Sequence, residues 1–176
     1  LMQTIASPPY DVITSEEARE LCSTNTKSFL NVNKPEIQFN KTDNIDQYDD
    51  RVYKMGKTQL DKFVENKWLI QDKTPCLYIY SQKMNNHQQF GLVCEASAIQ
   101  YENNLIKKHE LTRKKKEDDR TKLTDIQSAN VGPIFLCYKS LADINNLISN
   151  YVTNNKPYCS FIGNNPNDGV EHKLWC

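Results

Sequence analysis

Residues 113–120 form an unbroken run of charged side chains, and this run constrains the fold more than any other part of the sequence. Its bases come first and its acids follow four residues later, at the spacing that allows ion pairs across one turn of a helix. Charged residues on a helix usually face water and stabilise it only slightly through such pairs. The run therefore predicts a helix with a strongly charged surface.

The order of the charges also suits an anion site. With the base before the acid, each pair has the weaker orientation. If Thr112 is the N-cap, the bases occupy the first turn, where the helix dipole disfavours each of them by about 0.3–1 kcal/mol. A helix start that collects positive charge favours a phosphate or another anion. Two interpretations of this helix stay open, a solvated surface and an anion site.

The composition describes a globular chain without a global charge preference. At 176 residues, 38% of them hydrophobic, the chain can bury a core as one ordinary domain or two small ones. Its 22 basic and 22 acidic residues balance, so no overall field attracts nucleic acid or an anionic membrane. No apolar run approaches the roughly 20 residues that span a bilayer, and the first residues lack the features of a signal peptide. We expect a soluble, cytoplasmic protein.

Helix and strand patterns alternate along the chain. A capping box formed by Thr14 and Glu17 opens the first helix, and residues 85–87 give the clearest hairpin signal. Apolar spacing predicts helices over 14–22, 49–66, 112–130 and 141–151. Strands are expected over 28–32, 76–84, 88–95, 104–106, 133–138, 158–162 and 170–175, with a bulge at Gly91 and a loop over 39–48.

These patterns predict an α+β fold, with a mixed β-sheet and flanking helices. We divide the chain into an N-terminal α+β segment, residues 1–73, and a β-rich core, residues 74–176, which together can form one continuous domain. The tripeptide Gly56-Lys57-Thr58 is not a nucleotide P-loop, because the first glycine of that motif is absent and the tripeptide lies inside a predicted helix.

Six cysteines are spread widely along the chain, with no Cys-x-x-Cys motif and no paired histidines at zinc spacing. Four of them, Cys76, Cys94, Cys137 and Cys159, lie in apolar, strand-like runs. We interpret these four as buried free thiols, in keeping with the tendency of free cysteine to be buried. Disulfides or a metal site are the alternative.

Four short motifs carry a family resemblance. They are Pro-Pro-Tyr-Asp-Val, Lys-Lys-His-Glu-Leu-Thr, Lys-Glu-Asp-Asp-Arg and Asn-Val-Gly-Pro-Ile-Phe, at residues 8–12, 107–112, 116–120 and 130–135. In order and spacing they resemble a family long catalogued as of unknown function and later linked to pyrophosphate-dependent L-serine kinases. The resemblance implies a ParB/sulfiredoxin-like active-site fold and a phosphotransferase that forms O-phospho-L-serine from free L-serine and inorganic pyrophosphate.

The resemblance assigns chemistry to the His-Glu pair of the second motif. The family's glutamate takes the proton from the serine hydroxyl, so Glu110 is expected to be the general base. His109 is expected to hydrogen-bond phosphate or to position Glu110, and its alternative role is that of a structural histidine.

Phosphoryl transfer also needs cations that neutralise the transferring group. Lys116 and Arg120 are the expected phosphate clamps, arginine as a bidentate fork and lysine as a point charge. Asp118 and Asp119 are expected either to hold Mg²⁺, the implied cofactor, or to orient Arg120.

Three further residues are candidates for contact with the substrate or the phosphate donor. Two prolines hold Asp11 in an extended segment, where it either contacts substrate or metal or caps a turn. Asn130 and Gly132 would shape a backbone turn near the donor, although an ordinary helix stop explains them equally well.

The resemblance covers only the N-terminal portion of the family pattern. Family members carry a further, phosphate-binding Asp-Gly-His-His-Arg segment after a region resembling residues 172–175, whereas the chain ends at Cys176. We therefore expect the chain alone to be catalytically incomplete, with the rest supplied by a missing C-terminal region or a partner chain. The expected partners are L-serine with pyrophosphate or a nucleotide, and neither a membrane nor nucleic acid. The alternatives are an ATP- or ADP-dependent small-molecule kinase and a non-catalytic, ParB-like regulatory or binding module.

Overall fold

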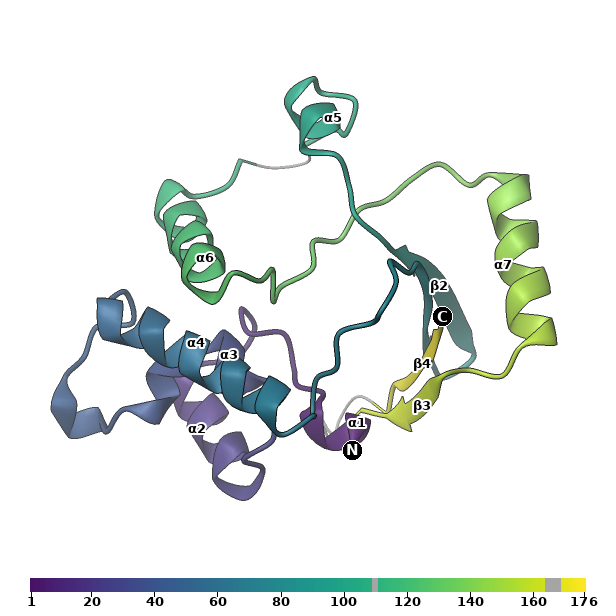
Figure 1. Cartoon of the computed structure of the whole chain (residues 1–176). Helices are drawn as coiled ribbons and strands as arrows, with labels where there is room; N and C mark the ends of the chain where they lie inside the picture. Colours follow the sequence, from purple (N-terminus) through teal and green to yellow (C-terminus); the bar gives the residue numbers. More distant parts are fainter. Residues whose placement is uncertain (109–110, 164–168) are drawn as a thin grey trace.

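The computed structural model describes residues 1–108, 111–163 and 169–176 and confirms an α+β fold (Figure 1). Its helices are α1 (Met2–Ile5), α2 (Ser15–Thr24), α3 (Leu30–Asn33), α4 (Asp50–Glu65), α5 (Ala98–Glu102), α6 (Lys114–Gln127) and α7 (Ala142–Asn154), with two short 3₁₀ helices, η1 (Pro35–Gln38) and η2 (Lys41–Asp43). Its strands are β1 (Tyr78–Met84), β2 (His87–Val93), β3 (Cys159–Ile162) and β4 (Glu171–Trp175). None of the helices in these ranges combines the length and the apolar character needed to span a lipid bilayer.

The four strands form one sheet in the order β2-β1-β4-β3. The hairpin predicted from the sequence is present: Met84 pairs with His87, and Asn85 adopts a positive φ of 54° in the turn between them. Asparagine tolerates that backbone conformation better than most residues, which suits a tight two-residue turn. All described pairings are antiparallel rather than mixed, and the continuous register of β1 and β2 leaves no bulge at Gly91.

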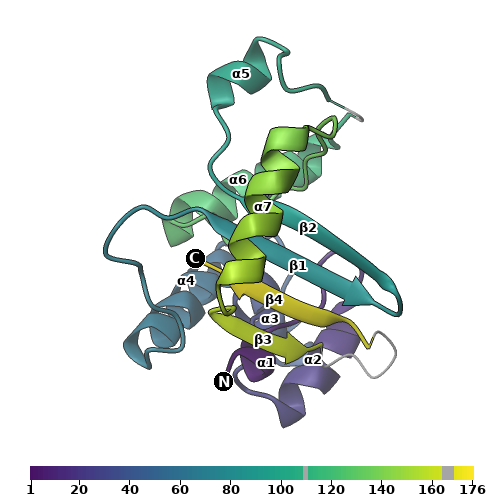
Figure 2. The same ribbon diagram turned by 90° about the vertical axis from the view of Figure 1, so that its right-hand side faces the viewer.

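Helix α7 covers one face of this sheet (Figure 2). Its buried Ile148 packs against Ile79 of β1 and Trp175 of β4. The Trp175 indole N–H donates a hydrogen bond to the Asn155 carbonyl over 3.1 Å, so the polar atom of this buried ring is satisfied. The apolar spacing that predicted a helix over 141–151 thus supplies the side chains that hold it to the sheet.

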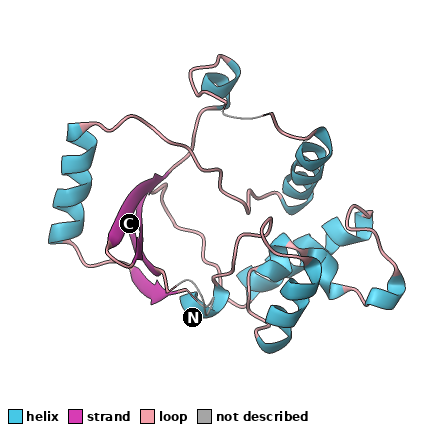
Figure 3. Ribbon diagram, turned by 180° about the vertical axis from the view of Figure 1, so that it is seen from behind, coloured by secondary structure: helices cyan, strands magenta, loops and turns pink. Residues whose placement is uncertain are grey.

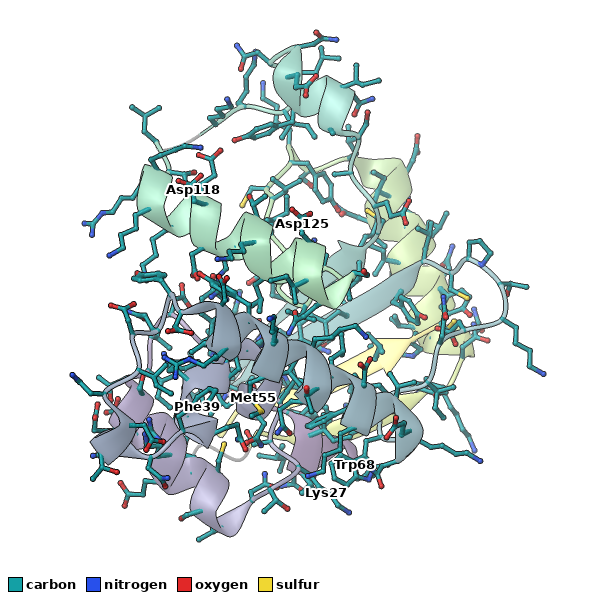
Figure 4. All side chains as sticks on the ribbon, turned by 60° about the vertical axis from the view of Figure 1, so that its left-hand side comes forward. Lys27, Phe39, Met55, Trp68, Asp118 and Asp125 are labelled. Carbon is teal, nitrogen blue, oxygen red and sulfur yellow. The ribbon has the colours of Figure 1, made fainter. Side chains whose placement is uncertain are left out.

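Helix α4 is central to the helical part of the chain, which lies on the other side of the sheet from α7 (Figures 1 and 3). Its Phe63 is fully buried and meets Phe29 and Trp68 edge-on, with ring centroids 5.7 and 5.0 Å away. Figure 4 shows Trp68 beside Lys27, whose ammonium lies 5.1 Å from the ring centroid. This aromatic cluster anchors the C-terminal end of α4.

Helix α6 lies along α4 (Figure 4), although the two fall in different segments of the division made from the sequence. Gly56 allows their close approach, because a Cβ atom there would lie 2.9 Å from Gln127 Nε2 and 3.1 Å from Leu123 Cδ1. Gly56 is inside α4, so the Gly-Lys-Thr tripeptide is helical and its glycine serves helix packing.

The strand predicted over residues 28–32 is wrong, because this stretch leads into the short helix α3. The Asn31 side-chain amide donates to the Ser28 carbonyl over 2.8 Å, a local bond that competes with a strand ladder. Pro35 follows at the start of η1.

The strands predicted over residues 104–106 and 133–138 are also wrong. The first stretch is a turn after α5, where Asn104 has a positive φ of 58°. The second has no strand pairing, and the side chains of Ile134 and Phe135 are 71% and 78% exposed. An apolar run measures hydrophobicity, but a strand also needs a neighbour for its backbone hydrogen bonds.

Helix α6 is shorter than predicted at both ends. Arg113 rather than Thr112 is its N-cap, because the backbone is still extended there. The helix ends at Gln127 rather than near Asn130, since Ser128 adopts a left-handed conformation with φ of 53°.

The cysteines differ in exposure from the prediction. All six thiols are free, but Cys94 and Cys137 are exposed, and Cys76 and Cys159 are only half-buried. Cys94 follows β2 and Cys137 lies in the unpaired run 133–138, so no strand neighbour covers either of them.

Candidate functional site

A cleft of about 540 Å³ opens between the N-terminal segment and the first turns of α6. Its walls come from stretches far apart in the sequence, within residues 10–13, 33–36, 47–53 and 111–123. Its ionisable and aromatic side chains are Tyr10, Asp11, Lys34, Glu36, Tyr53, Arg113, Lys116, Asp119 and Arg120. The cleft therefore joins parts of the Pro-Pro-Tyr-Asp-Val and Lys-Glu-Asp-Asp-Arg motifs.

Helix α6 presents one face to the cleft. Lys116, Arg120 and Leu123 are three or four residues apart, so they share a side of the helix. Leu123 is 2% exposed and Asp119 is 7% exposed, whereas most residues of the charged run are exposed. The run is thus solvated on one side of the helix and lines a cleft on the other.

Arg120 is held in place from two directions. Its Nε and Nη2 groups donate to Asp119 Oδ2 over 3.0 and 2.7 Å. Its guanidinium carbon lies 4.6 Å from the centroid of the Tyr10 ring, a cation–π contact between two of the motifs. Asp119 therefore orients Arg120, one of the two roles left open for it by the sequence.

Asp119 has a second partner, Tyr53 of α4. The Tyr53 hydroxyl donates to Asp119 Oδ1 over 2.9 Å, and Tyr53 is itself buried. Burial, with the hydrogen bond to Asp119, raises the pKa of Tyr53 well above its ordinary value, so the hydroxyl stays protonated and remains a donor. The two partners together offset the cost of burying the Asp119 carboxylate.

Asp118 does not join Asp119 at a shared site. Its carboxylate pairs with Lys114 over 2.8 Å on the exposed side of α6, where Figure 4 labels it, and it is not part of the cleft lining. Successive residues of a helix point about 100° apart, which separates the two carboxylates. Among the described residues, no three histidine, cysteine or acidic side chains lie close enough together to hold a metal ion.

Asp11 and Lys116 both line the cleft, and both are exposed to solvent. Asp11 directly follows Tyr10, whose ring lies against Arg120. The structure thus brings Asp11, Lys116 and Arg120 together, and each is accessible to a ligand. Their contact with substrate stays a prediction.

Asn130 and Gly132 are not part of the cleft lining, but their turn lies beside Tyr10, which is. The Gly132 N–H donates to Asn130 Oδ1 over 3.4 Å, which closes a turn after α6. A Cβ atom at Gly132 would lie 3.9 Å from Tyr10 Cε1. The Asn-Val-Gly-Pro-Ile-Phe motif therefore packs against the ring that contacts Arg120.

His109 and Glu110 lie outside the described residues. The three residues that follow them, Leu111, Thr112 and Arg113, line the cleft. The roles expected for the His-Glu pair stay predictions.

Three of the ionisable or aromatic cleft residues, Lys34, Glu36 and Tyr53, were not identified from the sequence. Lys34 Nζ lies 3.2 Å from Glu36 Oε1, with both side chains largely buried, and the same oxygen accepts a hydrogen bond from Ser15 Oγ over 2.8 Å. No sequence pattern marks this pair. Tyr53 does carry a signal, since it stands seven residues before Leu60 on the buried face of α4, but nothing local predicts Asp119 as its partner.

Comparison with known proteins adds one match. A family model described as "Protein of unknown function (DUF1015)" matches residues 1–176, which include every segment of the cleft. No curated protein and no solved structure matches the chain at a significant level.

Proposed function

We propose that this chain, which belongs to the DUF1015 family, carries the donor-binding cleft of a phosphotransferase that forms O-phospho-L-serine from free L-serine and inorganic pyrophosphate. One observation carries the proposal: two motifs separated by about a hundred residues meet in a cleft that holds Asp11, Lys116 and Arg120. The chemistry needs cations for the transferring group, polar contacts for the acceptor and a base for its hydroxyl.

The cations gather where α6 begins. Arg113 is the N-cap, Lys116 lies in the first turn and Arg120 one turn later, and all three line the cleft. Backbone N–H groups of a first helical turn lack helical partners and attract anions. Charge-assisted hydrogen bonds from Lys116 and Arg120 would neutralise charge on the phosphate oxygens. This arrangement suits a polyanion such as pyrophosphate.

Another wall of the cleft carries both signs of charge, which suits an amino acid. Lys34 and Glu36 lie side by side there. L-serine holds an ammonium and a carboxylate close together, so a base and an acid in one wall provide a partner for each once they exchange their own ion pair for the ligand. We assign Glu36 to the ammonium and Lys34 to the carboxylate.

Glu110 is the proposed base, with His109 contacting phosphate or positioning Glu110. In the sequence Glu110 directly precedes Leu111, which lines the cleft. The Glu110 carboxylate would accept the proton of the serine hydroxyl while the serine oxygen attacks a phosphorus atom of pyrophosphate. The bridging P–O bond breaks and inorganic phosphate leaves, with Lys116 and Arg120 neutralising the charge.

Mg²⁺, the cofactor implied by the resemblance, fits this cleft only together with the donor. Both Asp119 oxygens already accept hydrogen bonds, and Asp118 pairs with Lys114 outside the cleft. Mg²⁺ usually keeps several waters and binds one or two carboxylates plus substrate phosphates. Asp11 is the carboxylate that would hold it, and bound Mg²⁺ would neutralise charge on the donor.

Donor tests check this proposal. Protein carrying the chain is incubated with L-serine and pyrophosphate, ADP or ATP, and phosphoserine is measured. We expect product with pyrophosphate, loss of product in Arg120→Gln, and normal product in Lys114→Ala, whose side chain lies on the exposed side of the same helix. Product with a nucleotide alone would indicate a nucleotide-dependent kinase, and no product with any donor would refute the proposal.

A further inference from the structure

We propose that Tyr53 is a positioning residue for Arg120, acting through Asp119, and that it thereby sets the affinity of the cleft for a phosphate-type anion. This inference rests on the proposed function of the cleft and adds a residue from outside the four motifs. Through Tyr53, α4 would contribute to anion binding, although none of its charged residues lines the cleft.

The contacts form a continuous series from Tyr53 on α4 to Arg120 on α6, which lines the cleft. The Tyr53 hydroxyl, buried in α4, donates to Asp119 Oδ1 over 2.9 Å. Asp119 Oδ2 accepts from Arg120 Nε and Nη2 over 3.0 and 2.7 Å. The guanidinium carbon lies 4.6 Å from the centroid of the Tyr10 ring. Tyr53 is thus the most buried member of this series of contacts, held in the core.

Each Asp119 oxygen has a different partner, and this determines which N–H groups of Arg120 are left to bind a ligand. Asp119 Oδ2 takes the Nε–Nη2 edge of the guanidinium, which leaves Nη1 without a hydrogen-bond partner among the described residues. That end of the fork can bind an oxyanion in bidentate fashion with the second proton of Nη2. Tyr53 keeps Oδ1 occupied. Without the Tyr53 hydroxyl, Oδ1 is free to turn toward the guanidinium and compete with the anion.

Preorganisation explains why this matters for affinity. An arginine side chain has many rotamers, and ordering it on binding costs free energy. Asp119 and Tyr10 already hold Arg120 in one orientation before a ligand arrives. If Asp119 became more mobile, Arg120 would be less ordered before binding, and more of its ordering cost would fall on the binding step.

A double-mutant cycle on pyrophosphate affinity tests the proposal. Dissociation constants are measured by calorimetry at low salt for the wild type, Tyr53→Phe, Arg120→Gln and the double variant. We expect Tyr53→Phe to weaken binding by about three- to tenfold, the order of the net contribution of one ordinary hydrogen bond. In the Arg120→Gln background the same change should have no further effect, because Tyr53 acts only through Arg120.

Tyr48→Phe is the matched control. Tyr48 also lies beside α6, but its contact is through its ring, 4.2 Å from Lys115 Nζ, and it does not line the cleft. Its hydroxyl should therefore be dispensable for pyrophosphate binding. An equal loss in Tyr48→Phe, or a loss in Tyr53→Phe that persists without Arg120, would overturn the positioning role.

A second measurement separates this inference from the proposed function. The Nε–H resonance of Arg120, observed by NMR without ligand, should exchange faster with water in Tyr53→Phe than in the wild type. An unchanged Nε–H signal would reject Tyr53 as a positioning residue. Failure of the wild type to bind pyrophosphate, with the signal responding as expected, would instead reject the proposed function and the anion role with it.

Discussion

Asp119 links the fold to the cleft at the scale of a single residue. It belongs to a charged run that is mostly exposed, yet it is 7% exposed itself. Its two oxygens are divided between Tyr53 and Arg120. Because both oxygens have partners, Asp119 supports Arg120 and is poorly placed to take a proton from a ligand. Asp119 is therefore a poor candidate for the base, a role that the family resemblance assigns to Glu110.

We predict that Glu110→Gln cuts serine phosphorylation by about 10²–10⁴-fold, the usual contribution of a positioned general base. Glutamine keeps the shape and one acceptor oxygen but cannot take the proton, so pyrophosphate affinity should change little. Initial rates and calorimetric titration separate the two effects. If turnover stayed within a few-fold of the wild type, the role of base would pass to Asp11, an exposed acid in the described lining of the cleft.

At the scale of elements, the packing of α6 along α4 determines where the cleft lies. Tyr53 and Gly56 lie on the buried face of α4, and Asp119, Leu123 and Gln127 are the buried residues of α6. The packing that buries Leu123 therefore also sets the position of Arg120. A change in the separation of the two helices should alter stability and anion binding together.

Gly56→Ala tests the packing of α6 against α4. A Cβ atom at Gly56 would lie 2.9–3.2 Å from the side chains of Gln127, Leu123 and Pro35. Overpacking costs about 1–3 kcal/mol, while the better helix propensity of alanine returns up to about 1 kcal/mol. We expect a net loss of about 1 kcal/mol in the free energy of unfolding, measured by denaturant titration, and weaker pyrophosphate binding.

Gly91→Ala is the control for that variant, because a Cβ atom there meets no atom within 4 Å. It should not lower the free energy of unfolding. A Gly56→Ala protein as stable as the wild type would show that α6 can move away from α4 without cost.

The capping box of α2 predicts a pH dependence. The Glu17 carboxylate accepts hydrogen bonds from the Thr14 N–H over 2.8 Å and from the Thr14 hydroxyl over 2.7 Å. The backbone bond, then the side-chain bond, lowers the pKa of Glu17 below its ordinary value. Because the folded-state pKa is the lower one, the resulting stability is present above the ordinary glutamate pKa and is lost as pH falls through the lowered value.

Glu17→Gln should remove that part of the acid sensitivity. Thermal unfolding followed by circular dichroism from neutral pH to below about pH 4 measures it. Glu20→Gln, an exposed change in the same helix, should keep the wild-type profile. Identical acid profiles for Glu17→Gln and the wild type would show that the capping box contributes nothing measurable.

At the scale of the whole molecule, two packed regions lie on either side of the sheet. Helix α7 packs on one face, and α4 and α6 belong to the helical part on the other side (Figures 1 and 3). The apolar run 133–138 connects α6 to α7 without joining either core, since Ile134 and Phe135 are largely exposed. Cys137 lies in this run and is exposed, whereas Cys22 and Cys159 lie in packed elements and are half-buried.

Thiol labelling reads out this organisation. Burial raises the pKa of Cys22 and Cys159 above the ordinary value, which lowers their reactive thiolate fraction. Cys94 and Cys137 are exposed. We expect iodoacetamide at neutral pH to modify Cys94 and Cys137 before Cys22 and Cys159, as followed by peptide mass spectrometry, and to label all four similarly in urea. Slow labelling of Cys137 would mean that the run 133–138 is covered in solution.

Local patterns were sufficient where a feature depends on neighbours along the chain. The capping box of α2, the hairpin at Asn85 and the apolar stripes of α4 and α7 all involve residues within a few positions of one another, so the order of side chains predicts them. The family resemblance, carried by motifs far apart in the sequence, also predicted Asp11, Lys116 and Arg120 as site residues, and all three line the cleft.

Only the tertiary structure decided the features that need a distant partner. A strand requires a neighbouring backbone, which residues 133–138 lack, and a buried carboxylate requires partners that satisfy its charge. Tyr53 stands 66 residues before Asp119, and Tyr10 is still further from Arg120, so no local period records these contacts. The cleft residues within the motifs can be identified from the sequence, whereas Lys34, Glu36 and Tyr53 cannot. The way in which Arg120 is held depends on how α4, α6 and the segment around Tyr10 pack together.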